Sequence, residues 1–138
     1  MDLVPYLADV CLDLAELAPH CEIKYEPDGP IPIATDRAVR VALLMTELVT
    51  NAVKHAYPAG QQGRVLVRLT HADQDTVRLS VGDKGPGLPT AFEIERDSSI
   101  GIKIIRALIT QTGATLSIHQ HHPGTEFVID FPLRPDEG

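Results

Sequence analysis

Two segments in the middle of the chain alternate apolar and polar residues, and only a short link separates them. They are "RVLVRLT" (residues 64–70) and "TVRLSVGD" (residues 76–83), joined by "HADQD". Successive side chains of a strand point to opposite faces, so this alternation predicts two strands that each bury one face. The short polar link predicts that the strands pair as an antiparallel hairpin.

A second hairpin and several helices are predicted around the first hairpin. Residues 114–132 alternate on both sides of a Pro-Gly turn, and residues 22–26 form a candidate short strand. Residues 2–18, 35–56 and 100–113 instead repeat apolar residues at helical spacing. The order helix, strand, helix, hairpin, loop, helix, hairpin predicts an α/β (α+β) two-layer sandwich. Its sheet is mixed and mostly antiparallel, with helices packed on one face.

The first two predicted helices carry apolar stripes that give candidate core residues. Asp2 is a candidate N-cap, and Pro5 falls in the first turn, where proline is tolerated. The expected stripes are Leu3, Leu7, Val10, Leu14 and Leu17 in the first helix, and Val39, Ala42, Leu43, Thr46, Val49, Ala52 and Val53 in the second.

The composition excludes several classes of function. With 138 residues and 43% hydrophobic residues, the chain suffices for one domain with a real core. A net charge of −7 argues against nucleic-acid binding and against direct contact with an anionic membrane. No apolar run approaches the roughly 20 residues of a membrane span. Because Cys11 and Cys21 are expected to be free thiols and no signal peptide is evident, we expect a cytoplasmic protein.

A polar row on the second predicted helix is the first candidate functional feature. Glu47, Asn51 and then Lys54 and His55 follow one another at helical spacing, at the border of the apolar side. One interpretation is a solvated helix face whose basic end suits the helix dipole. In the other, the Asn51 amide oxygen binds a phosphate-bound Mg²⁺ and the Glu47 carboxylate accepts from a water. Lys54 and His55 would then neutralise phosphate oxygens.

The motif "DKGPG" is the second feature. Asp83 falls at the end of a predicted strand, and Gly85 and Gly87 follow it. The glycines would let the backbone approach a flat ligand closely. The carboxylate could accept a hydrogen bond from an exocyclic amine, which adenine has. A plain turn also explains such glycines.

The motifs "SSIGIKII" and "GTEFVIDFP" complete the set. Ile100 and Gly101 begin a predicted helix, whose free amide groups could receive phosphate. Thr125 lies at a strand start after a glycine. Taken singly, an ordinary helix start and an ordinary hairpin explain both motifs. No Walker A motif is present.

In their order and spacing, the four motifs resemble the ATP-binding domain shared by DNA gyrase, the heat-shock chaperones of that class, histidine kinases and MutL. "ELVTNAVKHA" is similar to the N box, "DKGPG" and "SSIGIKII" to the two glycine boxes, and "GTEFVIDFP" to the closing hairpin. The resemblance covers about residues 35–132 and implies the Bergerat (GHKL) fold. Within that superfamily the chain most resembles a sensor histidine kinase of the HWE-like subgroup.

The resemblance implies a role for each matched residue. Glu47 and Asn51 would be catalytic, with Asn51 as the Mg²⁺ ligand and Glu47 ordering water or the metal shell. The implied phosphate contacts are Lys54, His55, Ile100 and Gly101. Tyr57 would contact adenine or ribose, and Asp83 would accept a hydrogen bond from the adenine amine. Gly85 and Gly87 would line the adenine pocket, and Thr125 would support Asp83.

The resemblance also implies the organisation and the partners. Residues 19–134 would be the catalytic domain, residues 1–18 a helix that ends a dimerisation or linker segment, and residues 135–138 a frayed tail. The γ-phosphate would pass to a histidine on a separate dimerisation domain, and then to a response regulator. None of the 6 histidines lies on the first predicted helix, so the chain is expected to lack its own acceptor.

Three alternatives accompany these expectations. An anti-sigma-factor serine kinase of the same superfamily has a similar polar helix, and a non-catalytic nucleotide-binding module would keep the pocket without the transfer. The run "HQHH" puts His119 and His121 on one face of a strand, where they could hold a metal. An ordinary turn region is the favoured interpretation of that run, because no third ligand is evident.

Overall fold

Helices and strands follow one another in the predicted order. The structure is a computed structural model, and it describes residues 1–57, 61–84, 100–121 and 124–133. Its elements are α1 (Leu3–Leu17), β1 (Cys21–Pro27), α2 (Thr35–Ala56), β2 (Gly63–His71), β3 (Thr76–Asp83), α3 (Ile100–Thr112), β4 (Thr115–Gln120) and β5 (Thr125–Pro132).

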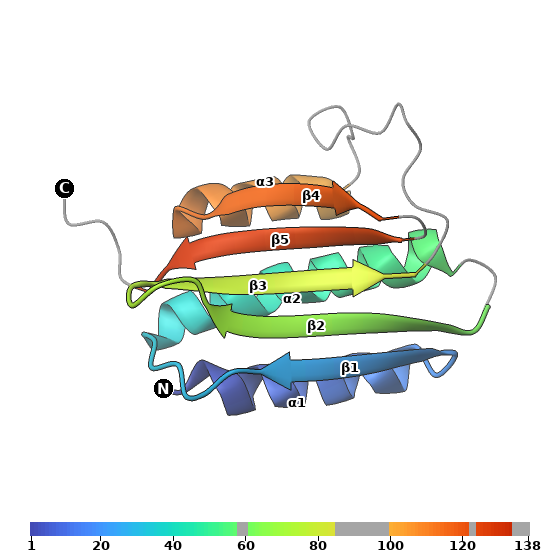
Figure 1. The fold of residues 1–138 in the computed structure, drawn as a ribbon, viewed down its shortest axis with the longest axis horizontal. Coiled ribbons are helices and arrows are strands. Elements are labelled where there is room, and N and C mark those ends of the chain that lie inside the picture. Colours follow the sequence, from blue (N-terminus) through green and yellow to red (C-terminus); the bar gives the residue numbers. More distant parts are fainter. Residues whose placement is uncertain (58–60, 85–99, 122–123, 134–138) are drawn as a thin grey trace.

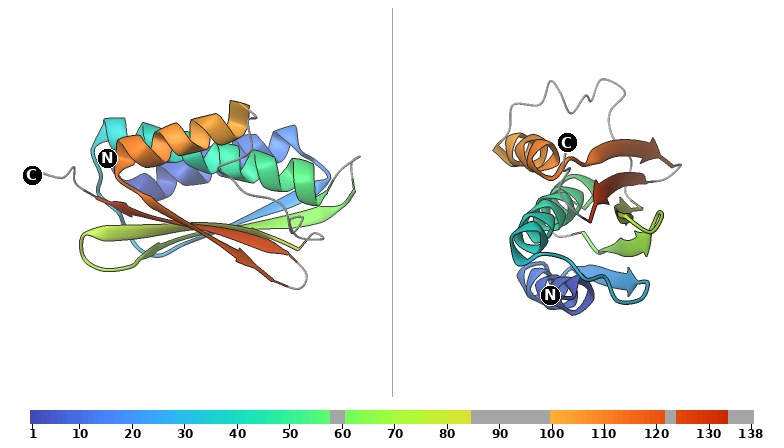
Figure 2. Two further views of the ribbon diagram at one scale, coloured as in Figure 1. Left: turned by 90° about the horizontal axis from the view of Figure 1, so that it is seen from above. Right: turned by 90° about the vertical axis from the view of Figure 1, so that its left-hand side faces the viewer.

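The strands form one 5-stranded sheet in the order β1-β2-β3-β5-β4 (Figure 1). β1 runs parallel to β2, and the remaining neighbours are antiparallel. All three helices lie on the same face of the sheet, as the two side views show (Figure 2). The predicted mixed, mostly antiparallel two-layer sandwich is therefore confirmed.

The apolar residues of the alternating segments form the inner face of the sheet, which contacts the helices. The helix-facing rows are buried: Val65, Val67 and Leu69 in β2, Val77, Leu79 and Val81 in β3, and Phe127, Ile129 and Phe131 in β5. The register places Val67 opposite Val81 and Leu69 opposite Leu79. Burying each such side chain contributes about 1.5–3 kcal/mol of hydrophobic stabilisation, so these rows fix the register.

Helix α1 is part of the same core. Asp2 caps it, because its carboxylate oxygen accepts hydrogen bonds from the amides of Val4 (3.0 Å) and Ile31 (2.9 Å). Its buried stripe is Leu3, Leu7, Cys11 and Leu14. The prediction for Leu17 is wrong: this residue is 82% exposed, because at about 100° per residue it lies to one side of the buried stripe.

The predicted packed side of α2 is partly wrong. Val39 and Leu43 are 42% and 50% exposed, whereas Leu44, Met45 and Leu48 are fully buried. Apolar residues occur around most of this helix, so their spacing alone defines no single stripe. Contacts with α1, α3 and the sheet select a buried side about one residue step, roughly 100°, from the predicted one.

Both cysteines are free and buried, as predicted. The Cys11 thiol lies 3.9 Å from the sulfur of Met45, between α1 and α2. Burial raises the pKa of the Cys11 thiol to about 11, so the thiol is protonated at neutral pH. Among the described helices, none combines the length and the apolar character that crossing a membrane requires.

Candidate functional site

Four segments that are distant in sequence end or begin at one side of the molecule. The C-terminal end of α2, the end of β3, the start of α3 and the start of β5 all lie toward the right in Figure 1. The sequence motifs with candidate functional residues fall on these segments. The fold therefore brings them to a single edge of the two-layer structure.

Two residues of the polar row of α2, Glu47 and Asn51, face the first turn of α3. A methyl group built on Gly101 would lie 3.1 Å from Glu47 Oε2 and 3.6 Å from Asn51 Oδ1. The two oxygens therefore converge on the backbone of Gly101, at the end of α3 where amide groups are free of helical partners. All three residues are half-buried. This group combines a carboxylate, a neutral oxygen donor and a helix N-terminus, which suits phosphate with a hard cation.

Asp83 and Thr125 form a second group, on the sheet at the same edge of the structure. By strand alternation, Asp83 continues the helix-facing row of Val77, Leu79 and Val81. The ladder pairs Gly82 with Glu126, so its next position sets Asp83 opposite Thr125. An apolar interlayer thus ends in a carboxylate and a hydroxyl.

The Thr125 hydroxyl is an orphaned buried polar atom. Thr125 is only 2% exposed, and its Oγ1 has no hydrogen-bond partner within the described part of the chain. A buried hydroxyl without a partner costs about 1–3 kcal/mol. The position therefore fits a polar atom of a bound molecule or an ordered water next to Asp83.

Gly124 allows β5 to start close to the end of β3. Its φ is 110°, and a side chain at this position would collide with the carbonyl oxygen of Asp83. Only glycine tolerates both the conformation and the contact. The sequence predicted a hairpin turn here but not this contact.

Tyr57 lies between α2, β2 and the end of β3. The side chain is 7% exposed, and its ring packs on Gly63, which leaves no room for a side chain there. The hydroxyl donates to the carbonyl of Arg64 (2.7 Å) and accepts from the amide of Lys84 (2.9 Å). The predicted contact of Tyr57 with a nucleotide stays a prediction. Within the protein, its hydroxyl contacts Arg64 in β2 and Lys84 directly after β3.

The structure does not place the remaining predicted residues next to Glu47, Asn51 and Gly101. Lys54 is exposed and borders an apolar groove between α1, β1 and α2. His55 and Ile100 lie in α2 and α3, but their side chains are outside the described part of the structure. Gly85 and Gly87 are outside the described residues altogether.

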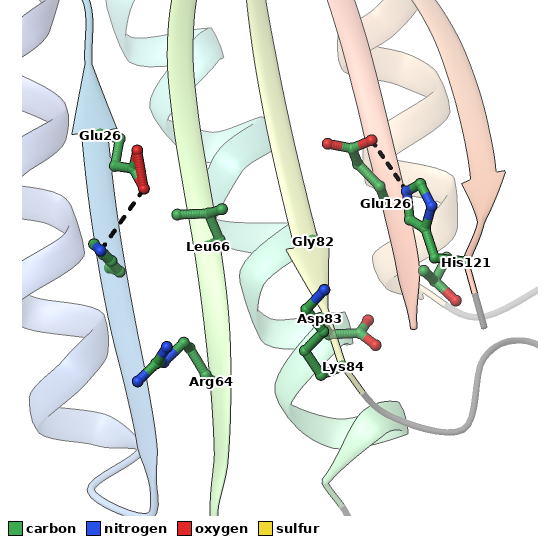
Figure 3. Close-up of a pocket in the computed structure, with 10 residues that line it drawn as sticks. Glu26, Arg64, Leu66, Gly82, Asp83, Lys84, His121 and Glu126 are labelled. Carbon is green, nitrogen blue, oxygen red and sulfur yellow. Dashed lines mark hydrogen bonds and ion pairs between the residues drawn. The ribbon is translucent and has the colours of Figure 1, made fainter. Parts of the chain in front are cut away.

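A separate hollow opens on the face of the sheet that the helices leave uncovered (Figure 3). Its volume is about 230 Å³, and the outward residues Leu66 and Gly82 form part of its lining. Asp83 and Thr125 border it as well, because they lie where the sheet ends. The contact of His121 Nε2 with Glu126 Oε1 (3.4 Å) lies on its rim. The hollow is thus distinct from the group formed by Glu47, Asn51 and Gly101.

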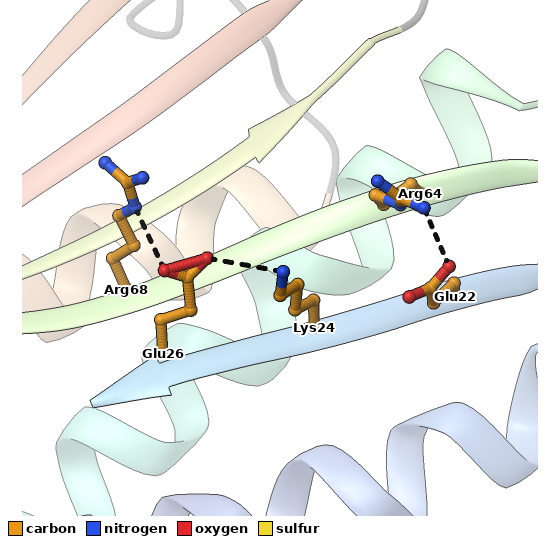
Figure 4. Close-up of polar contacts among 5 residues, drawn as sticks. All are labelled: Glu22, Lys24, Glu26, Arg64 and Arg68. Atoms are coloured by element: carbon orange, nitrogen blue, oxygen red, sulfur yellow. Dashed lines mark hydrogen bonds and ion pairs between the residues drawn. The ribbon is translucent and has the colours of Figure 1, made fainter.

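Ion pairs cover the same outward face (Figure 4). Arg64 contacts Glu22 at 3.2 Å, while Glu26 lies 3.9 Å from both Lys24 and Arg68. Such exposed pairs contribute about 0–1 kcal/mol each. No cluster of three histidine, cysteine or acidic side chains suited to a metal occurs in the described ranges, and the pair of His119 and His121 stays without a third ligand there.

Comparison with known proteins identifies the family. Residues 36–135 match the family described as "Histidine kinase-, DNA gyrase B-, and HSP90-like ATPase". The chain belongs to this ATPase family. The predicted resemblance to the ATP-binding domain of histidine kinases is thereby confirmed.

Relatives of this ATPase domain include named histidine kinases. The chain is 31% identical over 103 residues to Blue-light-activated histidine kinase 2 of Erythrobacter litoralis, covering 75% of this chain and 30% of the relative. It is 33% identical over 102 residues to the sensor histidine kinase PdtaS of Mycobacterium tuberculosis, covering 72% of this chain and 20% of the relative. The chain therefore spans less than a third of either protein.

Solved structures share the fold. The blue-light activated histidine kinase of Erythrobacter litoralis superposes with a TM-score of 0.88 at 27% identity, covering 96% of this chain and 42% of that one. The mycobacterial sensor histidine kinase MprB gives a TM-score of 0.77 at 23% identity, over 99% of this chain and 97% of that chain. At that lower identity, the second likeness supports the fold alone.

The contact of Gly101 with the polar row yields a first prediction. The change Gly101→Ala would displace Glu47 Oε2, because the added methyl group lies 3.1 Å from that oxygen, and it should weaken ATP binding by about fivefold, which is roughly 1 kcal/mol. Thermal stability should change little, because alanine is the better helix former. Gly82→Ala is the control, since its methyl group meets nothing closer than 3.8 Å. If calorimetry gave the same ATP affinity for both variants, the placement of Gly101 at the ATP site would be contradicted.

Proposed function

We propose that this ATPase domain binds Mg-ATP at the edge where α2, α3, β3 and β5 meet, and that it is the catalytic domain of a sensor histidine kinase of the HWE-like subgroup. The observation that carries the proposal is the convergence of Glu47 and Asn51 on the start of α3. The family match and the relatives named as histidine kinases support it.

The adenine end of the site is Asp83. Its carboxylate lies at the end of an apolar row, where Val65 and Val81 are buried beside it. A flat base could rest on that apolar edge while its exocyclic amine donates to Asp83. The orphaned Thr125 hydroxyl supplies a second polar contact, directly or through a water. Gly85 and Gly87 would continue the pocket.

The phosphate end lies at α2 and α3. The free amides of the first turn of α3, at Ile100 and Gly101, would receive phosphate oxygens. Asn51 Oδ1 would hold Mg²⁺, and Glu47 would order its water shell, because both oxygens point to the same place. The ion would supply neutralisation of phosphate charge. Lys54, with its long flexible stem, and His55 would add positive charge.

The phosphate acceptor is proposed to be a histidine on a separate dimerisation domain, followed by a response regulator. The chain covers 30% and 20% of its kinase relatives, so an acceptor could lie on another part of such a protein. α1 would connect to the dimerisation helices through Asp2 and Leu3. In this setting the domain works in the cytoplasm and positions ATP without needing an attacking water.

Binding measurements test the nucleotide site. Titration calorimetry should show ATP binding that strengthens with Mg²⁺, and Asp83→Asn should lower the affinity by about 1–3 kcal/mol, the value of a buried hydrogen bond to a charge. Asp130→Asn is the matched control, because Asp130 pairs with Arg78 (2.8 Å) on the outward face. Asn51→Ala should remove the Mg²⁺ effect. Failure to bind ATP or ADP at millimolar concentration would refute the proposal.

The chemistry of the product tests the acceptor. With labelled ATP and a separately expressed histidine-bearing dimerisation domain, the chain should yield a phosphoprotein that is labile in acid and stable in base. Asn51→Ala should abolish the label. An acid-stable product would instead indicate transfer to a hydroxyl group, as in a serine kinase.

A further inference from the structure

We propose that the Tyr57 hydroxyl is a positioning group that fixes the backbone carrying Asp83 and thereby sets the selectivity for adenine. The proposal rests on the proposed function, since it assigns the base contact to Asp83. It gives Tyr57 a role within the protein framework, in place of a direct contact with the nucleotide.

The phenol of Tyr57 is held at both ends. Its ring occupies the space over Gly63, where any larger residue would collide with it. Its hydroxyl donates to the Arg64 carbonyl at 2.7 Å and accepts from the Lys84 amide at 2.9 Å. With 7% of the residue exposed, water competes poorly for these bonds. The side chain is thus a rigid link from β2 to the end of β3.

The link acts on the peptide group that joins Asp83 to Lys84. The amide of this peptide donates to Tyr57, and its carbonyl oxygen lies against Gly124, the residue before β5. Because the peptide group is planar, holding its two sides fixes its orientation. The backbone from which the Asp83 carboxylate projects is therefore clamped between Tyr57 and Gly124.

The same link joins the two halves of the site. Tyr57 directly follows the last turn of α2, and its own amide donates to the Val53 carbonyl at 3.2 Å. Asn51 and Glu47 lie on that helix, whereas Asp83 lies on the strand that the hydroxyl holds. The hydroxyl therefore sets the separation between the phosphate end and the adenine end. Phenylalanine would fill the same space but would lose both hydrogen bonds of the hydroxyl.

The consequence is a selectivity effect. Asp83 can accept from the exocyclic amine of adenine, whereas guanine presents a carbonyl oxygen at that position. Displacement of the Asp83 carboxylate should lower the affinity for ATP more than the affinity for GTP. The ratio of the ATP affinity to the GTP affinity should therefore fall. A general loss of stability would weaken both nucleotides alike and leave that ratio unchanged.

The test compares Tyr57→Phe with Tyr25→Phe. The Tyr25 hydroxyl donates to the Val4 carbonyl at 2.9 Å, so this control also loses a partly buried hydrogen bond, but between β1 and α1. Calorimetry with Mg-ATP and Mg-GTP should show the ATP-to-GTP affinity ratio falling about three- to tenfold in Tyr57→Phe, the value of one lost hydrogen bond, and not in Tyr25→Phe. Exchange of the Lys84 amide, followed by NMR, should quicken only in Tyr57→Phe.

Gly124→Ala is a second variant, because it presses on the other side of the same peptide group and should lower the same ratio. An unchanged ATP-to-GTP ratio in both variants, with normal ATP binding by the unsubstituted chain, would overturn the inference alone. Absence of ATP binding by the unsubstituted chain would overturn the proposed function and, with it, the base contact on which the inference rests.

Discussion

The structure depends on the burial of the inner rows of β2, β3 and β5 beneath three helices. These rows are apolar until the edge of the sheet, where Asp83 and Thr125 replace valine and phenylalanine. A carboxylate and a hydroxyl at the end of a buried row require polar partners. The same register that stabilises the core therefore presents polar atoms at one fixed place, beside the start of α3.

The two faces of the sheet carry different kinds of side chains. The inner face holds the core and ends at the proposed nucleotide site, while the outward face carries exposed ion pairs and the hollow bordered by Leu66 and Gly82. Strand alternation creates this division, because each strand sends successive side chains to opposite faces. The proposed site for ATP is at the edge between the layers, where Glu47 and Asn51 of α2 converge on the start of α3.

Much of this arrangement could be predicted from the sequence, because the strand alternation and the four motifs are local signals. The hairpins and the cap at Asp2 follow from such signals. The convergence of Glu47 and Asn51 on Gly101 depends on the packing of α2 against α3, which no local pattern reveals. The buried side of α2 could not be predicted, since tertiary contacts decided between two apolar faces. The Tyr57 contact with Lys84 spans 27 residues and depends on the pairing of strands, so no local pattern reveals it.

The most direct test of the central claim is to follow backbone amide signals by NMR as Mg-ATP is added. The account predicts the largest changes at the Glu47–Asn51 turn, at Asp83, at Gly101 and at Thr125, with little change on the outward face at Leu66 and His121. Saturable changes centred on Leu66 and His121, with the signals of α2 and α3 unmoved, would contradict it.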